Sequence, residues 1–394
     1  MPADLLPDNG TGERSWGLYI SVPFCRFKCT YCNFASGVFA GGELERYLRA
    51  LAWEIRDWKG PRDAGRDVRR ESADTVYLGG GTPSMLSPAQ IQALFGWLRE
   101  AFRVAPNAEI TLEAAPGGID AELLAAWRAC GVNRVSLGVQ SFEERELKAV
   151  GRPHRAQTVV DDVAALRASG IRSVNIDLIA GLPYQTPASW EESLAWVGRL
   201  RPEHVSVYIL EVDEDSRLGS EVLAGGRRYS VESLPDDDTT AGLYTHAIER
   251  LAELGYAQYE ISNFALPGCE SRHNKKYWEL APYAGFGVDA HSFDGDDRWA
   301  NVDSVGEYLE RAGRGESPVA ARHAVDDQRR TEERLFLGLR QNQGVELAPA
   351  ERARYQREIA TMAETGLLEL SGDWLRLTPR GRMLSNEVFA RFIG

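Results

Sequence analysis

A repeated pattern of short apolar runs, each followed by a turn and an amphipathic stretch, fills the first two-thirds of the chain. The runs are rich in β-branched and other apolar residues, as expected for strands buried on both faces of a parallel sheet. They occupy residues 18–24, 75–78, 109–114, 134–139, 173–179 and 204–210. Such units predict an α/β fold, either a partial (β/α)6 barrel or an open doubly wound sheet. Periodicity alone does not choose between the two.

Local signals mark where two of the helices begin. Residues 88–102 carry apolar side chains at helical spacing, and Ser87 can cap this helix with Gln90 completing a capping box. A second helix is expected to begin at residues 186–187, where a threonine is followed by proline. The polar, glycine-rich residues 213–236 instead predict a long loop.

The texture of the sequence changes after about Ala321, where helical stretches precede a hairpin around Ser371-Gly372-Asp373. Helices followed by a β-hairpin predict a small winged-helix-like domain. We therefore divide the chain into a short N-terminal segment (1–17), a barrel (18–255), a connecting segment (256–320) and a C-terminal helical, winged-helix-like domain (321–394).

The charge balance argues against binding to duplex nucleic acid. The chain has 45 basic and 58 acidic residues, a net charge of −13, whereas nucleic-acid binders gain affinity from basic residues. No apolar run reaches the roughly 18 residues that a membrane span needs, and the first residues lack the pattern of a secretory signal. We expect a cytoplasmic protein, for which membrane association is possible only through a partner.

Three of the five cysteines, Cys25, Cys29 and Cys32, follow the first predicted strand with C-x3-C-x2-C spacing. An odd count clustered in this way is typical of a reduced, metal-binding protein rather than of a disulfide framework. A structural zinc site would need a second cysteine pair, which the sequence lacks. Three thiolates on one loop instead suit a [4Fe-4S] cluster, and they leave one iron open to a chelating substrate.

Other residues that suit ligand binding come at the ends of the predicted strands. Gly79-Gly80-Gly81 ends the second strand, where glycine lets a backbone approach a ligand closely or simply makes a tight turn. Glu113 ends the third strand, Gln140 follows the fourth and Asp177 lies in the fifth. Functional groups of a barrel gather at this end of the strands, so we expect these side chains to lie together.

The cysteine spacing, with the aromatic Tyr31 before the last cysteine, resembles that of the radical S-adenosylmethionine superfamily. In that superfamily the amino and carboxyl groups of S-adenosylmethionine bind the open iron. Electron transfer then cleaves the sulfonium and gives a 5'-deoxyadenosyl radical. The resemblance implies a partial or full barrel with the cluster loop after the first strand, and so favours the six-unit barrel.

Residues 19–25, 79–83, 136–142 and 175–183 narrow the resemblance to oxygen-independent coproporphyrinogen III dehydrogenase and its relatives, over about residues 16–394. On that likeness, S-adenosylmethionine contacts Tyr19, Tyr31, Gly80, Gly81, Thr82, Glu113, Gln140, Arg152 and Asp177. Two features differ from the dehydrogenase. Phe34 stands where the dehydrogenase has a fourth cysteine, and the segment before the first strand is short. Both features resemble the related HemW family of heme chaperones.

Residues 273–278, with the sequence HNKKYW, resemble the H-N-x-x-Y-W motif of those chaperones. A histidine beside two aromatic residues suits an axial heme ligand with stacking neighbours, or else a histidine satisfied by local hydrogen bonds. The family resemblance favours heme ligation by His273. His291 and Cys269 are further candidates, but the strand-like position of His291 favours a structural role, and Cys269 also fits a buried thiol.

The resemblance implies a heme chaperone that binds a [4Fe-4S] cluster, S-adenosylmethionine and heme and passes heme to an acceptor protein. It also implies an electron donor for the cluster. The alternative is an enzyme, the dehydrogenase that oxidatively decarboxylates coproporphyrinogen III to protoporphyrinogen IX. Phe34 and the motif around His273 favour the chaperone, so we do not expect the dehydrogenase activity.

Overall fold

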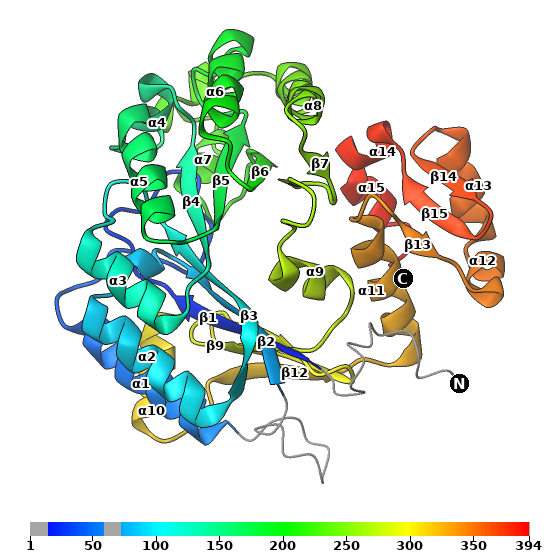
Figure 1. The fold of residues 1–394 in the computed structure, drawn as a ribbon. Coiled ribbons are helices and arrows are strands. Elements are labelled where there is room, and N and C mark those ends of the chain that lie inside the picture. The colour runs from blue at the N-terminus through cyan, green and yellow to red at the C-terminus, as the bar shows by residue number, and fades with distance from the viewer. Residues whose placement is uncertain (1–14, 59–71, 394) are drawn as a thin grey trace.

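Six parallel strands form the centre of the fold, in the same order in the sheet as in the sequence (Figure 1). The structure is a computed structural model that describes residues 15–58 and 72–393, so the predicted N-terminal segment lies almost entirely outside it. The strands are β1 (Trp16–Val22), β2 (Ser72–Gly80), β3 (Arg103–Ala114), β4 (Arg134–Gln140), β5 (Ser173–Ala180) and β6 (His204–Ile209). Each predicted apolar run is confirmed as a strand.

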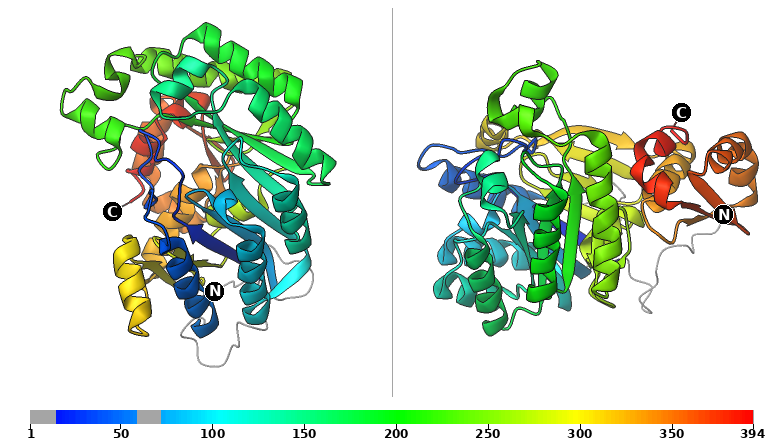
Figure 2. Two further views of the ribbon diagram at one scale, coloured as in Figure 1. Left: turned by 90° about the vertical axis from the view of Figure 1, so that its left-hand side faces the viewer. Right: turned by 90° about the horizontal axis from the view of Figure 1, so that it is seen from above.

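The strand order decides between the two predicted architectures. A doubly wound sheet reverses its order at a switch point and carries helices on both faces. Here β1 to β6 follow one another without reversal, and helices form an arc around the outer face of the curved sheet (Figures 1 and 2). These helices are α1 (Glu43–Asp57), α2 (Pro88–Ala101), α3 (Ala121–Cys130), α4 (Glu144–Ala149), α5 (Ala156–Ala168) and α6 (Pro187–Leu200). The partial barrel is confirmed.

Local capping explains where the helices start. The Ser87 hydroxyl accepts a hydrogen bond from the Gln90 backbone N–H at the start of α2, and the Gln90 side chain completes the predicted capping box. Thr186 caps α6 in the same way. The predicted loop at residues 213–236 is wrong in part, because it contains α7 (Arg217–Leu223) and the 3-10 helix η3 (Arg228–Ser233).

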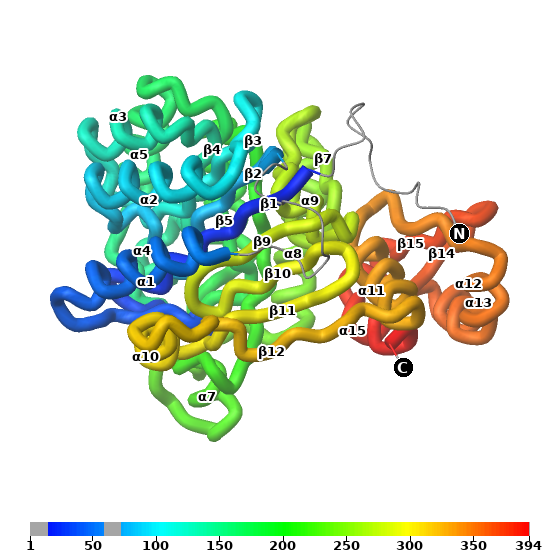
Figure 3. The backbone as a smooth tube through the Cα atoms, turned by 90° about the horizontal axis from the view of Figure 1, so that it is seen from below, coloured from blue at the N-terminus to red at the C-terminus, as the bar shows by residue number. Residues whose placement is uncertain are grey.

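The sheet extends beyond the six predicted units on both sides. The strands β9 (Tyr283–Phe286), β10 (His291–Phe293), β11 (Asp297–Asn301) and β12 (Val319–Ala324) continue it outward from β1 (Figure 3). β8 (Asn263–Ala265) and β7 (Ala257–Gln258) continue it from β6, which gives twelve strands in the described residues. The segment expected to connect two domains therefore supplies strands to both edges of the main sheet. The remaining elements here are η2 (Pro83–Met85), α8 (Asp237–Glu253), α9 (Arg272–Trp278) and α10 (Val305–Gly313).

The C-terminal region packs around an apolar cluster of its own that includes Leu335, Leu375 and Phe392. The predicted hairpin is confirmed as β14 (Leu368–Ser371) and β15 (Trp374–Leu377), and β13 (Val345–Glu346) joins it in a separate sheet. The helices are α11 (Asp327–Leu339), α12 (Pro349–Arg354), α13 (Gln356–Glu364), α14 (Pro379–Met383) and α15 (Ser385–Phe389). This region stands across from the arc of outer helices (Figure 2). Among the described helices, none combines the length and apolar character that crossing a membrane requires.

Candidate functional site

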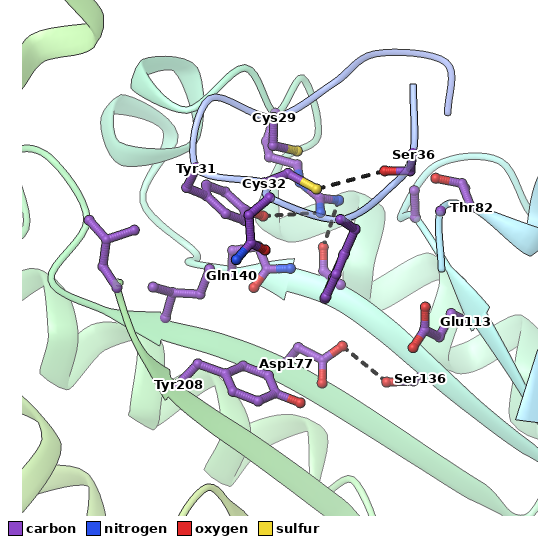
Figure 4. A pocket seen from close by; sticks show the side chains of 18 of the residues that line it. Cys29, Tyr31, Cys32, Ser36, Thr82, Glu113, Ser136, Gln140, Asp177 and Tyr208 are labelled. Carbon is purple, nitrogen blue, oxygen red and sulfur yellow. Dashed lines mark hydrogen bonds between the residues drawn. The ribbon is translucent and has the colours of Figure 1, made fainter. Parts of the chain in front are cut away.

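A cavity of about 800 Å³ opens at the carboxyl ends of the parallel strands. The cysteine loop between β1 and α1 overhangs it, and side chains from β3, β4 and β5 point into it from below (Figure 4). Most of the predicted site residues line this cavity: Cys25, Cys29, Tyr31, Cys32, Gly80, Gly81, Thr82, Glu113, Gln140, Arg152 and Asp177. The predicted gathering of polar groups at this end of the strands is therefore seen in the structure.

The cysteine loop is held against the segment that follows β2 by hydrogen bonds from Thr82. The Thr82 N–H donates to the Phe24 carbonyl at 2.8 Å, and the Thr82 hydroxyl donates to the Cys25 sulfur at 3.4 Å. A Cβ at Gly81 would lie 2.6 Å from the Val22 carbonyl oxygen, so only glycine permits this approach. The triple glycine thus serves the docking of the loop as well as any ligand.

The three thiols are free and lie in the wall of one cavity. Across residues 15–58 and 72–393, no three His, Cys, Asp or Glu side chains converge closely enough to hold a single metal ion. A four-iron cluster makes a different demand, because its irons stand at separate corners and each thiolate binds its own iron. Three separate thiols on one loop suit that demand, and a four-iron cluster held by them would have its fourth iron without a protein ligand.

Glu113 is a buried carboxyl group at the end of β3. The Tyr77 hydroxyl donates to it at 2.7 Å, and among the described residues it forms no ion pair with lysine or arginine. Burial raises its pKa to about 7, and the nearby Asp177 adds to the rise. A buried acid without a cationic partner in a cavity wall suits a positively charged ligand.

Asp177 on β5 accepts hydrogen bonds from Ser136 at 3.0 Å and from Asn175 at 2.6 Å. Burial raises its pKa as well. Neighbouring polar atoms lack partners: within the described chain, the Gln140 amide oxygen and the Arg152 Nε are buried without a hydrogen bond. Such orphaned atoms are expected where a bound molecule completes the hydrogen bonding.

Arg152 and Tyr31 form one wall of the cavity. The guanidinium donates to the Tyr31 hydroxyl at 3.2 Å and to the Gly138 carbonyl at 3.0 Å. The backbone of Gln140, at the end of β4, lies in the left-handed region with φ 70°. Few residues other than glycine adopt this conformation. Tyr19 lies just outside the cavity wall, with its hydroxyl beneath the turn at Gly80.

His273 lies toward the opposite end of the barrel, where α9 contacts the first half of β2 and the middle of β3. Its Nδ1 is 2.8 Å from the Thr75 hydroxyl and its Nε2 is 2.8 Å from the Tyr277 hydroxyl. The Glu109 carboxylate accepts from the His273 backbone N–H at 3.0 Å, and burial lowers the ring pKa to about 3. With both ring nitrogens engaged and 1% of the residue exposed, His273 offers no nitrogen to a heme iron in this structure.

The two other heme-ligand candidates also lie outside the cavity. The His291 side chain is 67% exposed and lies 3.7 Å from the Asp289 carboxylate, so the expected structural role is not seen. Sequence reasoning missed residues that the C-terminal region adds to the cavity wall, including Arg340, Arg382 and Met383. They belong to no local motif, and only the tertiary fold brings them near the cysteine loop.

Comparison with known proteins agrees with this geometry. Residues 19–197 match the radical SAM superfamily, and residues 325–384 match the HemN C-terminal domain. The crystal structure of coproporphyrinogen III oxidase (HemN) from Escherichia coli superposes with a TM-score of 0.83 at 27% identity, covering 96% of this chain and 90% of that one. Fold and site thus define a radical SAM protein with a HemN-like architecture.

Curated relatives identify the family within that class. The heme chaperone HemW of Bacillus subtilis is 34% identical over 95% of this chain and 98% of its own length. The heme chaperone HemW of Mycobacterium tuberculosis is 35% identical over 97% of this chain and 95% of its own. The chain belongs to the HemW family.

Proposed function

We propose that this protein is a heme chaperone that binds a [4Fe-4S] cluster, S-adenosylmethionine and heme, and transfers heme to an acceptor protein. The observation that carries the proposal is that three free thiols and the acidic side chains at the strand ends line one and the same cavity. Relatives named heme chaperone match almost the whole chain, including its C-terminal region, and support the same function.

Cys25, Cys29 and Cys32 would hold the cluster. Once reduced, a cluster held there would supply the electron that cleaves the sulfonium of bound S-adenosylmethionine. An electron donor is then a required partner. The chain's own part is to hold the cofactor and exclude water. Glu113 presents a carboxylate to the positively charged molecule, and the backbone at Gly80 and Gly81 permits a close approach.

The remaining cofactor contacts follow from the orphaned polar atoms. The Gln140 amide oxygen accepts a hydrogen bond from the cofactor, while Arg152 and Asp177 fix its polar groups through atoms already oriented by Tyr31 and Ser136. Tyr19 acts from beneath Gly80 rather than from the wall. We do not propose His273 as a heme ligand, because both of its ring nitrogens are engaged in hydrogen bonds that heme binding would disturb.

Dehydrogenation of coproporphyrinogen III is the second candidate, favoured by the structural similarity to HemN over nearly the whole chain. The sequence of the cysteine loop argues against the dehydrogenase activity. Phe34, in place of the dehydrogenase's fourth cysteine, is 64% exposed at the cavity. The loop therefore presents an apolar surface there rather than a thiol.

An anaerobic reconstitution separates the two candidates. The loaded protein is titrated with heme and, in parallel, incubated with coproporphyrinogen III, S-adenosylmethionine and a reductant. A stoichiometric Soret band without protoporphyrinogen formation supports the chaperone. Multiple-turnover formation of protoporphyrinogen IX would refute it and support the dehydrogenase.

A further inference from the structure

The cavity extends beyond the cysteine loop and the strand ends to the C-terminal region. Arg340 and Arg382 line this far side together with Tyr244 and Met383. Both arginines influence the ionisation of the Tyr244 phenol, which places them near one side chain. The groups assigned to the cluster and S-adenosylmethionine come from the cysteine loop and the strands, so these arginines have no part in that assignment.

Arg382 is a half-buried cation that forms no ion pair with an acidic residue in the part of the chain that the structure describes. One of its terminal nitrogens donates to the neutral Asn342 side chain at 2.9 Å, and in the described chain its buried Nε has no hydrogen-bond acceptor. The neighbouring carboxylate of Glu369 is engaged 2.7 Å away by Arg376. A buried guanidinium nitrogen without an acceptor is costly unless a ligand supplies one.

Arg340 differs because its charge is already balanced. It lies 3.3 Å from the buried Glu260 carboxylate and stacks over the Trp278 ring, with its centre 4.5 Å from the ring centroid. Its Nε nevertheless has no acceptor among the described residues. The far wall therefore carries the excess positive charge of Arg382 and further donors from Arg340.

Large aromatic side chains are exposed in the lining of the same cavity, among polar residues such as Arg26 and Lys28. Phe27 and Phe34 on the cysteine loop are 45% and 64% exposed, and Tyr208 on β6 is 42% exposed. Met383 lies beside Arg382 in sequence and also faces the cavity. Exposed aromatic side chains together with an unpaired cation on the far wall fit a large, flat, apolar molecule that carries carboxylate groups. A tetrapyrrole with propionate side chains has this chemistry.

We propose that the C-terminal region completes a tetrapyrrole site in this cavity, in which Arg382 anchors a propionate carboxylate and the exposed aromatic side chains cover the ring. The inference rests on the proposed heme-binding function and gives the position of the heme site in the fold. Arg340 adds a hydrogen-bond donor beside the anchor while remaining paired with Glu260.

The test compares heme with heme dimethyl ester, whose propionates carry no charge, by Soret titration of the full-length protein. Wild type is expected to bind heme about tenfold more tightly than the ester, since a hydrogen bond to a charged group contributes about that much. Arg382→Gln should lose about tenfold for heme and nothing for the ester. Arg382→Lys, which keeps the charge, should retain part of the difference.

Arg380→Gln is the matched control, because Arg380 is exposed, lies on the same helix and does not line the cavity. It should bind both ligands like wild type. The effect of S-adenosylmethionine on the resonance spectrum of the reduced cluster reports folding of Arg382→Gln independently.

The possible outcomes test the role of Arg382 as a propionate anchor separately from the proposed heme-binding function. If wild type binds heme and its dimethyl ester with equal affinity, the wild-type titration alone refutes the assignment of a propionate anchor. Equal losses for both ligands in Arg382→Gln would also refute it, because they indicate a packing effect. If wild type binds no heme, the proposed function itself fails.

Discussion

We predict that the buried Glu113 carboxyl group makes cofactor binding depend on pH. With a pKa of about 7, it is roughly one-tenth ionised at pH 6 and nine-tenths ionised at pH 8. A positively charged cofactor binds the ionised form, so the affinity for S-adenosylmethionine should rise about tenfold across this range. Glu113→Gln keeps an acceptor for the Tyr77 hydroxyl but loses the charge. It should bind about 10- to 100-fold more weakly, because a hydrogen bond to a charged group contributes about 1.5–3 kcal/mol.

The measurement is equilibrium binding of S-adenosylmethionine to the cluster-loaded protein between pH 6 and pH 8, with Glu113→Gln as the comparison. The variant separates Glu113 from the cofactor's own amino group, which titrates equally with both proteins. The reasoning fails if the variant keeps wild-type affinity, or if both proteins show the same pH dependence.

The stability of the cofactor-free protein provides an independent check that the pKa of Glu113 is raised rather than lowered in the folded state. The folded-state pKa of Glu113 lies above its usual value of about 4.5, so folding favours the protonated acid. Its contribution to stability is fully present below about pH 4.5 and is lost as the pH rises through about 7. Glu113→Gln should therefore show a smaller decrease in the free energy of unfolding between pH 5 and pH 8. An equal decrease in both proteins would contradict the burial argument.

Four further outcomes follow from the structure. Replacing the three loop cysteines together should abolish the about four iron and four sulfide ions per chain expected of the reconstituted protein; their retention would remove the cluster assignment. His273→Ala should cost about 2–4 kcal/mol of stability, because two buried hydroxyls lose their partner, yet leave the Soret titration unchanged. His291→Ala, at an exposed site, should change stability by less than about 0.5 kcal/mol in urea unfolding. Ser87→Ala should lower stability by about 1 kcal/mol through loss of the α2 cap, and a smaller change would show that the cap is dispensable.

Sequence patterns predicted best what depends on near neighbours. The six strands and the caps at Ser87 and Thr186 follow from local periodicity and local hydrogen bonds. The convergence of Glu113 and Asp177 was also predictable, because the carboxyl ends of parallel strands meet at one edge.

The sequence could not show where remote segments dock. The residue types around His273 suit a heme site, but the position of α9 at the far end of the barrel depends on ion pairs such as Lys276 with Asp74, 2.8 Å apart. Arg382 reaches the cavity only because the C-terminal region packs against the main sheet. Its neighbours in the sequence give no sign of that contact.

The place of β9 beside β1 bears on how the chain folds as it leaves the ribosome. Tyr283–Phe286 pair in parallel with Gly17–Ile20, so the strand that leads into the cysteine loop gains its second neighbour only after most of the chain has been synthesised. Contacts between such distant segments form slowly. The cysteine thiols are therefore synthesised early, while the edge of β1 that later pairs with β9 is still unpaired. The residues that complete the cavity around them are synthesised later. We expect the nascent chain to be more open to oxidation and misassembly than the finished protein.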